Sequence, residues 1–283
     1  MTGFSRIFQY FQALSLDVSL GGVVGCMFVS SYLGIHVDPK TYLVLAITIW
    51  LIYTLDHLMD IQNTIDPPIT FRHRFHWNNA TTMWGVWSFL LIVVSSIIYK
   101  LPPATLFAGF VVSVFVLLYF LSLKILKNKN IYYKEVFAAL IYAVGIFLPS
   151  VSLNHEDMGL DIWLLFVEMF SLAYINLLIF SIFERMIDKQ EGYHSLVKTL
   201  GVESVRGITW GLILAVGVIS LAGLYLIDNQ FFVYSQFLIL GMDICFTLIM
   251  FRRDFFIKRT RYRIFGDAVF FLPIIYLIML HEL

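Results

Sequence analysis

The chain has 283 residues, of which 60% are hydrophobic and only 13% are charged. Soluble domains carry about 45–50% apolar and about 25% charged residues, so this composition excludes a soluble globular protein and also a disordered chain. The 19 basic and 19 acidic residues cancel, so no nucleic acid is expected as a partner. The two cysteines, Cys26 and Cys245, lie in apolar runs and indicate neither a disulfide framework nor a zinc site. The remaining class is a polytopic membrane protein.

Nine apolar segments are long enough, or nearly so, to cross a bilayer as helices, which requires roughly 20 residues each. These segments are apolar on every face, whereas a transmembrane β-barrel shows alternating segments of about 10 residues. The sequence therefore predicts an all-α membrane protein, a bundle of nine transmembrane helices in a single polytopic domain over residues 1-283. The spans are expected at 14–35, 41–61, 78–99, 104–126, 135–153, 161–183, 207–227, 232–251 and 266–281.

A short amphipathic segment precedes the first span. Phe4, Ile7, Phe8 and Phe11 recur there at helical spacing, with polar residues between them. This pattern predicts a helix that lies in the membrane interface over about residues 4-13.

The basic residues predict the orientation of the bundle, because cytoplasmic connections are enriched in Lys and Arg. With a cytoplasmic N-terminus, Lys40 and Lys100 are the only ones of the 19 basic residues that fall on the outer side. We therefore predict an integral, multi-pass protein of an inner or cytoplasmic membrane, with its N-terminus in the cytoplasm. The outer connections are short, whereas the inner stretches 62-77 and 185-206 are long and polar, so any active-site loops are expected on the cytoplasmic side.

Two pairs of acidic residues stand at the inner ends of the second and sixth spans. Asp56 and Asp60 are four residues apart, and Glu184 and Asp188 repeat this spacing. On a helix, such a pair shares one face, and its charges repel each other unless a cation lies between them. If the two pairs face each other, they form an all-oxygen site that suits Mg²⁺, which typically binds through one or two carboxylates and a substrate's phosphates.

These features resemble the UbiA superfamily of intramembrane prenyltransferases, over essentially the whole chain. That family has nine transmembrane helices and two aspartate-rich motifs, one after the second helix and one after the sixth. The segment 56–60 matches the end of its first motif, Asn-Asp-x-x-Asp-x-x-x-Asp, and 184–192 matches its second, Asp-x-x-x-Asp-x-x-x-Gly. The sequence departs from this pattern in two places: Ile52 and Tyr53 replace the leading Asn-Asp, and Glu184 replaces an aspartate.

The resemblance implies a Mg²⁺-dependent transferase that moves a prenyl group from an isoprenyl diphosphate to a lipophilic or aromatic acceptor held in the lipid bilayer. The acidic residues of both motifs would hold the metal, and three basic residues would contact the diphosphate: Arg72, Arg74 and Lys124. The positive-inside rule alone would also explain basic residues at these positions, and the same ambiguity applies to Lys134.

Two other functions remain open at this stage. One is a terpene cyclase of the same superfamily, which traps the allylic cation internally. The other is a membrane transporter or a binding protein with a degenerate site. Polar residues deep in the spans bear on this choice, because intramembrane ionisable groups are functional candidates. Glu168 and Asp243 are such candidates, Asn176 is expected to form a hydrogen-bonded pair between helices, and Asp17 and Asp267 are expected near the interface, in contact with water.

Overall fold

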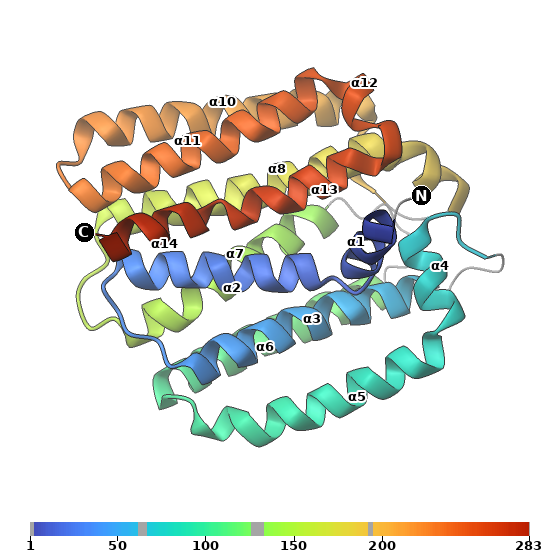
Figure 1. The fold of residues 1–283 in the computed structure, drawn as a ribbon, viewed down its shortest axis with the longest axis horizontal. Helices are drawn as coiled ribbons and strands as arrows, with labels where there is room; N and C mark the ends of the chain where they lie inside the picture. Colours follow the sequence, from blue (N-terminus) through green and yellow to red (C-terminus); the bar gives the residue numbers. More distant parts are fainter. Residues whose placement is uncertain (1–2, 62–66, 126–132, 192–194, 283) are drawn as a thin grey trace.

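The computed structural model describes residues 3–61, 67–125, 133–191 and 195–282, and only the backbone of residues 3–6, 188–189, 191 and 280–282. All regular elements in these ranges are helical, as the sequence predicts (Figure 1). The α-helices are α1 (Gly3–Ala13), α2 (Leu16–Tyr32), α3 (Pro39–Ile61), α4 (Phe71–Asn78), α5 (Ala80–Ile97), α6 (Pro103–Ile125), α7 (Lys134–Leu153), α8 (Leu160–Glu191), α9 (Leu196–Leu200), α10 (Val202–Leu226), α11 (Gln230–Phe251), α12 (Arg253–Phe256), α13 (Arg261–Ala268) and α14 (Pro273–Glu282). Short 3₁₀ turns lie at η1 (Ile98–Lys100), η2 (Lys258–Thr260) and η3 (Val269–Phe271).

The number of spans agrees with the prediction. Among the described residues, eight helices are long and apolar enough to cross a membrane. A ninth is obtained if the bent pair Ile7–Ala13 and Leu16–Tyr32 counts as one span, with a bend of 70°. Figure 1 shows α1 at the right-hand end of the bundle, out of line with the long helices. A separate amphipathic helix is therefore present where one was expected, and its position in the membrane interface stays a prediction.

The bundle is organised around two central helices. Helix α8 is the most buried of the candidate spans and packs against α7, α10 and α11, while α2 packs against α3, α7 and α14. A glycine lets α2 approach α3 closely, since a Cβ at Gly22 would lie 2.3 Å from Ile49. The periphery is apolar as well, with Phe107, Phe110 and Phe115 exposed along α6. An exposed apolar surface of this kind requires lipid around it.

Two predicted boundaries differ from the structure, and both lie at the end of the molecule where the motifs are. Helix α8 runs on to Glu191 instead of ending at 183, and most of the predicted loop 185–206 is helical. The last span begins at Arg261 rather than at 266. The extra residues in α8 include Glu, Arg, Met, Lys and Gln, which are good helix formers. Hydropathy therefore located the end of the apolar run, while the helix itself continues beyond it.

Candidate functional site

The first acidic motif ends helix α3 and meets a lysine from another helix. Asp56 and Asp60 lie one helical turn apart, and each side chain is 27% exposed. Lys134, the first residue of α7, places its Nζ 3.5 Å from Asp56 Oδ1 and 3.6 Å from Asp60 Oδ2. The cation that the two carboxylates require is thus supplied here by a side chain of the protein itself.

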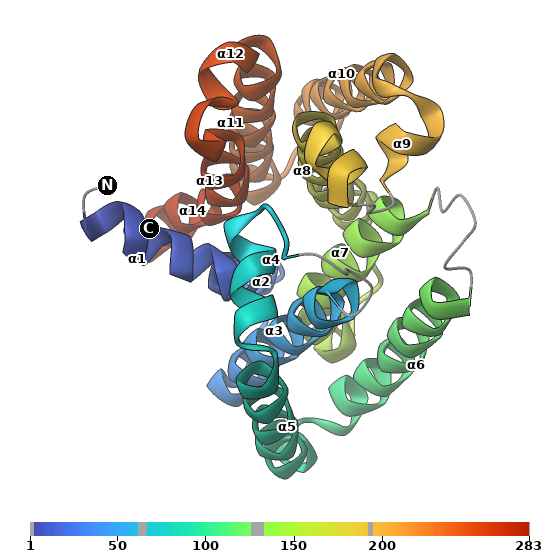
Figure 2. The ribbon, with the colours of Figure 1, turned by 90° about the vertical axis from the view of Figure 1, so that its right-hand side faces the viewer.

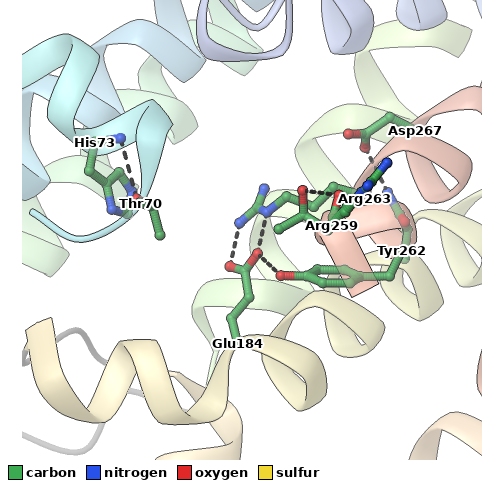
Figure 3. Close-up of polar contacts among 9 residues, drawn as sticks. Thr70, His73, Glu184, Arg259, Tyr262, Arg263 and Asp267 are labelled. Atoms are coloured by element: carbon green, nitrogen blue, oxygen red, sulfur yellow. Dashed lines mark hydrogen bonds and ion pairs between the residues drawn. The ribbon is translucent and has the colours of Figure 1, made fainter. Parts of the chain in front are cut away.

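The second motif is held quite differently. Glu184 on α8 accepts a two-pronged ion pair from Nε and Nη2 of Arg263, and Tyr262 donates its hydroxyl to Glu184 Oε1 at 2.8 Å (Figure 3). The Glu184 side chain is only 11% exposed. In this arrangement Glu184 points to α13, and it does not join Asp56 and Asp60 in the all-oxygen site that the sequence suggested.

The early start of the last span explains this pairing. Because α13 begins at Arg261, Arg263 and Tyr262 are helical residues rather than parts of a connecting loop. Gly266 allows α13 to pack closely on α8, since a Cβ there would lie 2.4 Å from Asn176 Oδ1. Two further residues of the predicted site, Asp188 and the motif glycine Gly192, cannot be placed: the Asp188 side chain and the whole of Gly192 lie outside the described residues.

Helix α4 carries the two arginines of the predicted diphosphate site and directs them differently. Arg72 is half-buried and interacts electrostatically with Glu184, Asp267 and Asp56. Its Nε has no hydrogen-bond partner in the part of the chain that the structure describes. Arg74 is exposed and donates to the backbone carbonyls of the preceding turn, from Nε to Pro68 and from Nη2 to Ile69. Arg72 therefore lies within electrostatic range of these acidic residues and of Arg263, whereas Arg74 donates hydrogen bonds to its own loop.

The remaining basic residue of the prediction lies apart. Lys124 is exposed near the end of α6. From the sequence, Lys134 is equally ambiguous, yet it is Lys134 that contacts the first motif. Arg263 was assigned to a cytoplasmic connection and was missed as a site residue. Its spacing of four residues from Asp267 is the signal that could have extended the last helix to include it.

Two of the deeper polar residues form local pairs, whereas the buried Oδ1 of Asp243 has no hydrogen-bond partner among the described residues. Asn176 donates to Asp267 at 3.2 Å, which confirms the expected hydrogen bond between helices. Glu168 accepts hydrogen bonds from Ser220 at 2.8 Å and from Gln236 at 2.9 Å and is fully buried. Asp17 is only 5% exposed, so the expectation that water solvates it is wrong. It lies within reach of Asp267 and Arg72 inside the bundle.

Viewed along the bundle, the short helix α4 lies over the end of the ring of long helices, in front of α2 and α3 (Figure 2). This end brings together carboxylates from α3 and α8 with cations from α4, α7 and α13. Such an arrangement can bind a highly charged anion through its cations, and a divalent metal through Asp56 and Asp60.

Comparisons with known proteins support the architecture. No protein-family profile and no curated protein matches the sequence significantly. Among solved structures, a UbiA homologue from Archaeoglobus fulgidus bound to DMAPP and Mg²⁺ is similar, with a TM-score of 0.63 and 12% identity over 94% of this chain and 98% of that one. The same homologue bound to GPP and Mg²⁺ gives a TM-score of 0.62 at the same identity and coverage. A structure of digeranylgeranylglyceryl phosphate synthase gives 0.52 with 16% identity over 96% and 94% of the two chains. The protein therefore has the fold of the UbiA superfamily.

Proposed function

We propose that this protein is an intramembrane prenyltransferase that transfers a prenyl group from an isoprenyl diphosphate to a lipophilic or aromatic acceptor. One observation carries the proposal: the first acidic motif, Lys134 and Arg72 come together at one end of an apolar bundle. That bundle has the fold of a protein solved with DMAPP and with GPP, each with Mg²⁺. We further propose that this end faces the cytoplasm, as the distribution of basic residues predicts.

The donors present at the first motif fit Mg²⁺. Asp56 and Asp60 offer hard oxygen ligands on one helix face, and Mg²⁺ often uses one or two carboxylates and completes its shell with water and phosphate oxygens. Because both oxygens of Glu184 are engaged by Arg263, we assign the metal to the first motif. When bound there, Mg²⁺ would neutralise negative charge on the diphosphate leaving group.

The side chains of the protein would perform the remaining steps. The fork of Arg72 can donate two parallel hydrogen bonds to diphosphate oxygens. Lys134 is held by ion pairs longer than 3 Å, so its ammonium can turn from the carboxylates to the diphosphate. The bond between C1 of the prenyl chain and the bridging oxygen breaks, and its electron pair leaves with the diphosphate. The acceptor then supplies the electron pair of the new bond at C1 and loses a proton.

The apolar surroundings serve this chemistry by keeping water away from the allylic cation. Tyr119 is 7% exposed and stacks on Phe137 with ring centroids 6.2 Å apart, and Tyr142 packs edge-on against Phe270. Tyr119 also lies within electrostatic reach of Asp56 and Lys134. These rings border the charged end of the bundle, where a prenyl chain would begin its course into the apolar interior.

The test uses membranes that contain the protein and radiolabelled GPP, with and without a panel of quinone, phenol and glycerol-ether acceptors. Release of diphosphate together with a labelled acceptor is expected. Cyclic hydrocarbon formed without any acceptor would support a terpene cyclase instead. If no donor of any chain length releases diphosphate, while labelled solutes enter proteoliposomes, the protein is a transporter and the proposal fails.

A further inference from the structure

A cluster of histidines lies beside the first motif and is not used in the proposed transfer reaction. His57 lies on α3 between the two aspartates, and His73 and His76 lie on α4. All three are buried, with exposed fractions of 3%, 7% and 0%. The His57 ring centroid is 5.9 Å from that of His73 and 5.0 Å from that of His76. Three imidazoles thus meet where α4 folds back on α3.

Three residues of this region bring metal-ligating atoms together. One ligand atom each from His57, Asp60 and His73 lies within 4.8 Å of the others. Two donors of one tetrahedral zinc ion lie about 3.3 Å apart, since each Zn–N bond is about 2.0–2.1 Å long. Side-chain rotations that close a gap of at most about 1.5 Å would therefore bring the three ligand atoms to bonding distance of one ion.

The hydrogen bonds leave ring nitrogens available. His76 Nδ1 lies 3.0 Å from the carbonyl of Arg72, which can only accept, so Nδ1 carries the proton and Nε2 has a bare lone pair. His57 Nε2 lies 3.4 Å from Ser15 Oγ. In the described part of the chain, neither His57 Nδ1 nor His76 Nε2 has a hydrogen-bond partner.

The buried, unpartnered Nδ1 of His57 points to a ligand, because buried polar atoms in proteins are nearly always satisfied. The His57 arrangement is also that of a metal-binding histidine, in which one ring nitrogen contacts a protein oxygen and the other faces the ion. Two imidazoles with one carboxylate suit a borderline transition-metal ion, whereas Mg²⁺ prefers oxygen ligands alone.

We propose that His57, Asp60 and His73 form a second metal site, which shares Asp60 with the Mg²⁺ site but is specific, through its two imidazoles, for a divalent transition metal such as Zn²⁺. The bound ion would tie α4 to the end of α3 and so fix the helix that carries Arg72. This site does not depend on the proposed transferase activity, because its ligands are in place without any prenyl diphosphate.

The test is zinc binding by the purified, detergent-solubilised protein after removal of metals by chelation. Titration against a chromogenic zinc chelator, in excess Mg²⁺, is expected to show one tight site per chain. His57→Asn and His73→Asn should each weaken zinc binding by more than about 100-fold, since even the loss of a residue that only supports a ligand costs about 10–100-fold. Asp56→Asn and His155→Asn serve as controls and should bind zinc normally, because Asp56 is outside the set and His155 is an exposed histidine elsewhere.

Several outcomes would overturn the proposal: no tight zinc site, zinc that Mg²⁺ displaces, or zinc bound equally by the His73→Asn protein. X-ray absorption at the zinc edge of the unaltered protein provides a check that needs no variant. Scattering from two imidazole rings is expected, and a shell of oxygen atoms without imidazole would refute the site. Neither measurement involves prenyl transfer, so a failure here is distinct from a failure of the proposed function.

Discussion

The two acidic segments, at the end of α3 and near the end of α8, share a sequence spacing but are held in opposite ways. The carboxylates of Asp56 and Asp60 are partly open to solvent and lie 3.5 and 3.6 Å from Lys134. Charge-assisted hydrogen bonds are shorter, about 2.7–2.9 Å, so these pairs are loose. Glu184 is buried and held by two residues of α13, Tyr262 and Arg263. The comparison indicates that the first segment is available to a ligand, while Glu184 braces α8 against α13.

The largest effect on stability is therefore expected at Glu184. Replacing Glu184 by Gln leaves the Arg263 guanidinium, which is only 17% exposed, without its paired carboxylate. Breaking a buried ion pair in this way costs about 3–5 kcal/mol. Thermal unfolding in detergent micelles, followed by circular dichroism, should show a clear fall in the unfolding temperature of the Glu184→Gln protein.

The matched control comes from the other segment. Asp56→Asn should change the free energy of unfolding by about 1 kcal/mol or less, because partly exposed ion pairs contribute little. The double change Glu184→Leu with Arg263→Met removes both buried charges and should recover part of the lost stability. Equal destabilisation by Asp56→Asn and Glu184→Gln would contradict the conclusion that only Glu184 has a structural role.

The first segment, which matters less for stability, is expected to matter more for activity. Asp56→Asn and Asp60→Asn each remove one charge from the proposed Mg²⁺ site without changing the side-chain size. Each is expected to lower kcat/KM with a labelled prenyl diphosphate by about 100-fold or more, the usual cost of losing one group that stabilises the leaving charge. Size-exclusion chromatography would verify that both proteins remain folded. Near-normal turnover by the protein that carries both Asp56→Asn and Asp60→Asn would show that the first motif does not bind the metal.

A smaller effect, opposite in sign, is expected at Lys134. Its ammonium occupies the space between Asp56 and Asp60 that we assign to the metal. Lys134→Met removes this competitor and, in the absence of diphosphate, should lower the Mg²⁺ concentration that half-saturates the site by about fivefold, the equivalent of about 1 kcal/mol for a partly exposed pair. Binding of Mn²⁺ in place of Mg²⁺, measured by electron paramagnetic resonance, reports this shift without turnover. An unchanged or increased metal requirement would show that Lys134 does not compete for the site.

The two acidic segments also differ in how far their surroundings can be predicted from the sequence. Hydropathy predicted the all-α bundle and the position of Asp56 and Asp60, because apolar runs and the i, i+4 spacing depend on the local sequence alone. The partner of Glu184 was not predictable in this way, since Arg263 is 79 residues away in the sequence. Arg263 can pair with Glu184 because α13 begins at Arg261, earlier than hydropathy predicts. The role of Lys134 was equally hidden, because topology explains a basic residue at that position whether or not it contacts the motif.

Arg72 and Arg74 lie two residues apart on one short helix, and different effects on substrate binding are expected for them. Arg72 lies within electrostatic range of the acidic residues and has an unpartnered Nε, so Arg72→Gln should raise KM for the prenyl diphosphate by about tenfold, the cost of one or two charge-assisted hydrogen bonds. Arg72→Lys keeps the charge, loses only the two-pronged geometry, and should fall between that variant and the unaltered protein. Arg74→Gln gives up hydrogen bonds to two backbone carbonyls of its own turn and should leave KM within about twofold, because its partners bind no substrate. Steady-state kinetics on the three variants would establish the order. If Arg74→Gln raised KM as much as Arg72→Gln, the inward and outward faces of α4 would not differ in function, and the diphosphate would have to reach both.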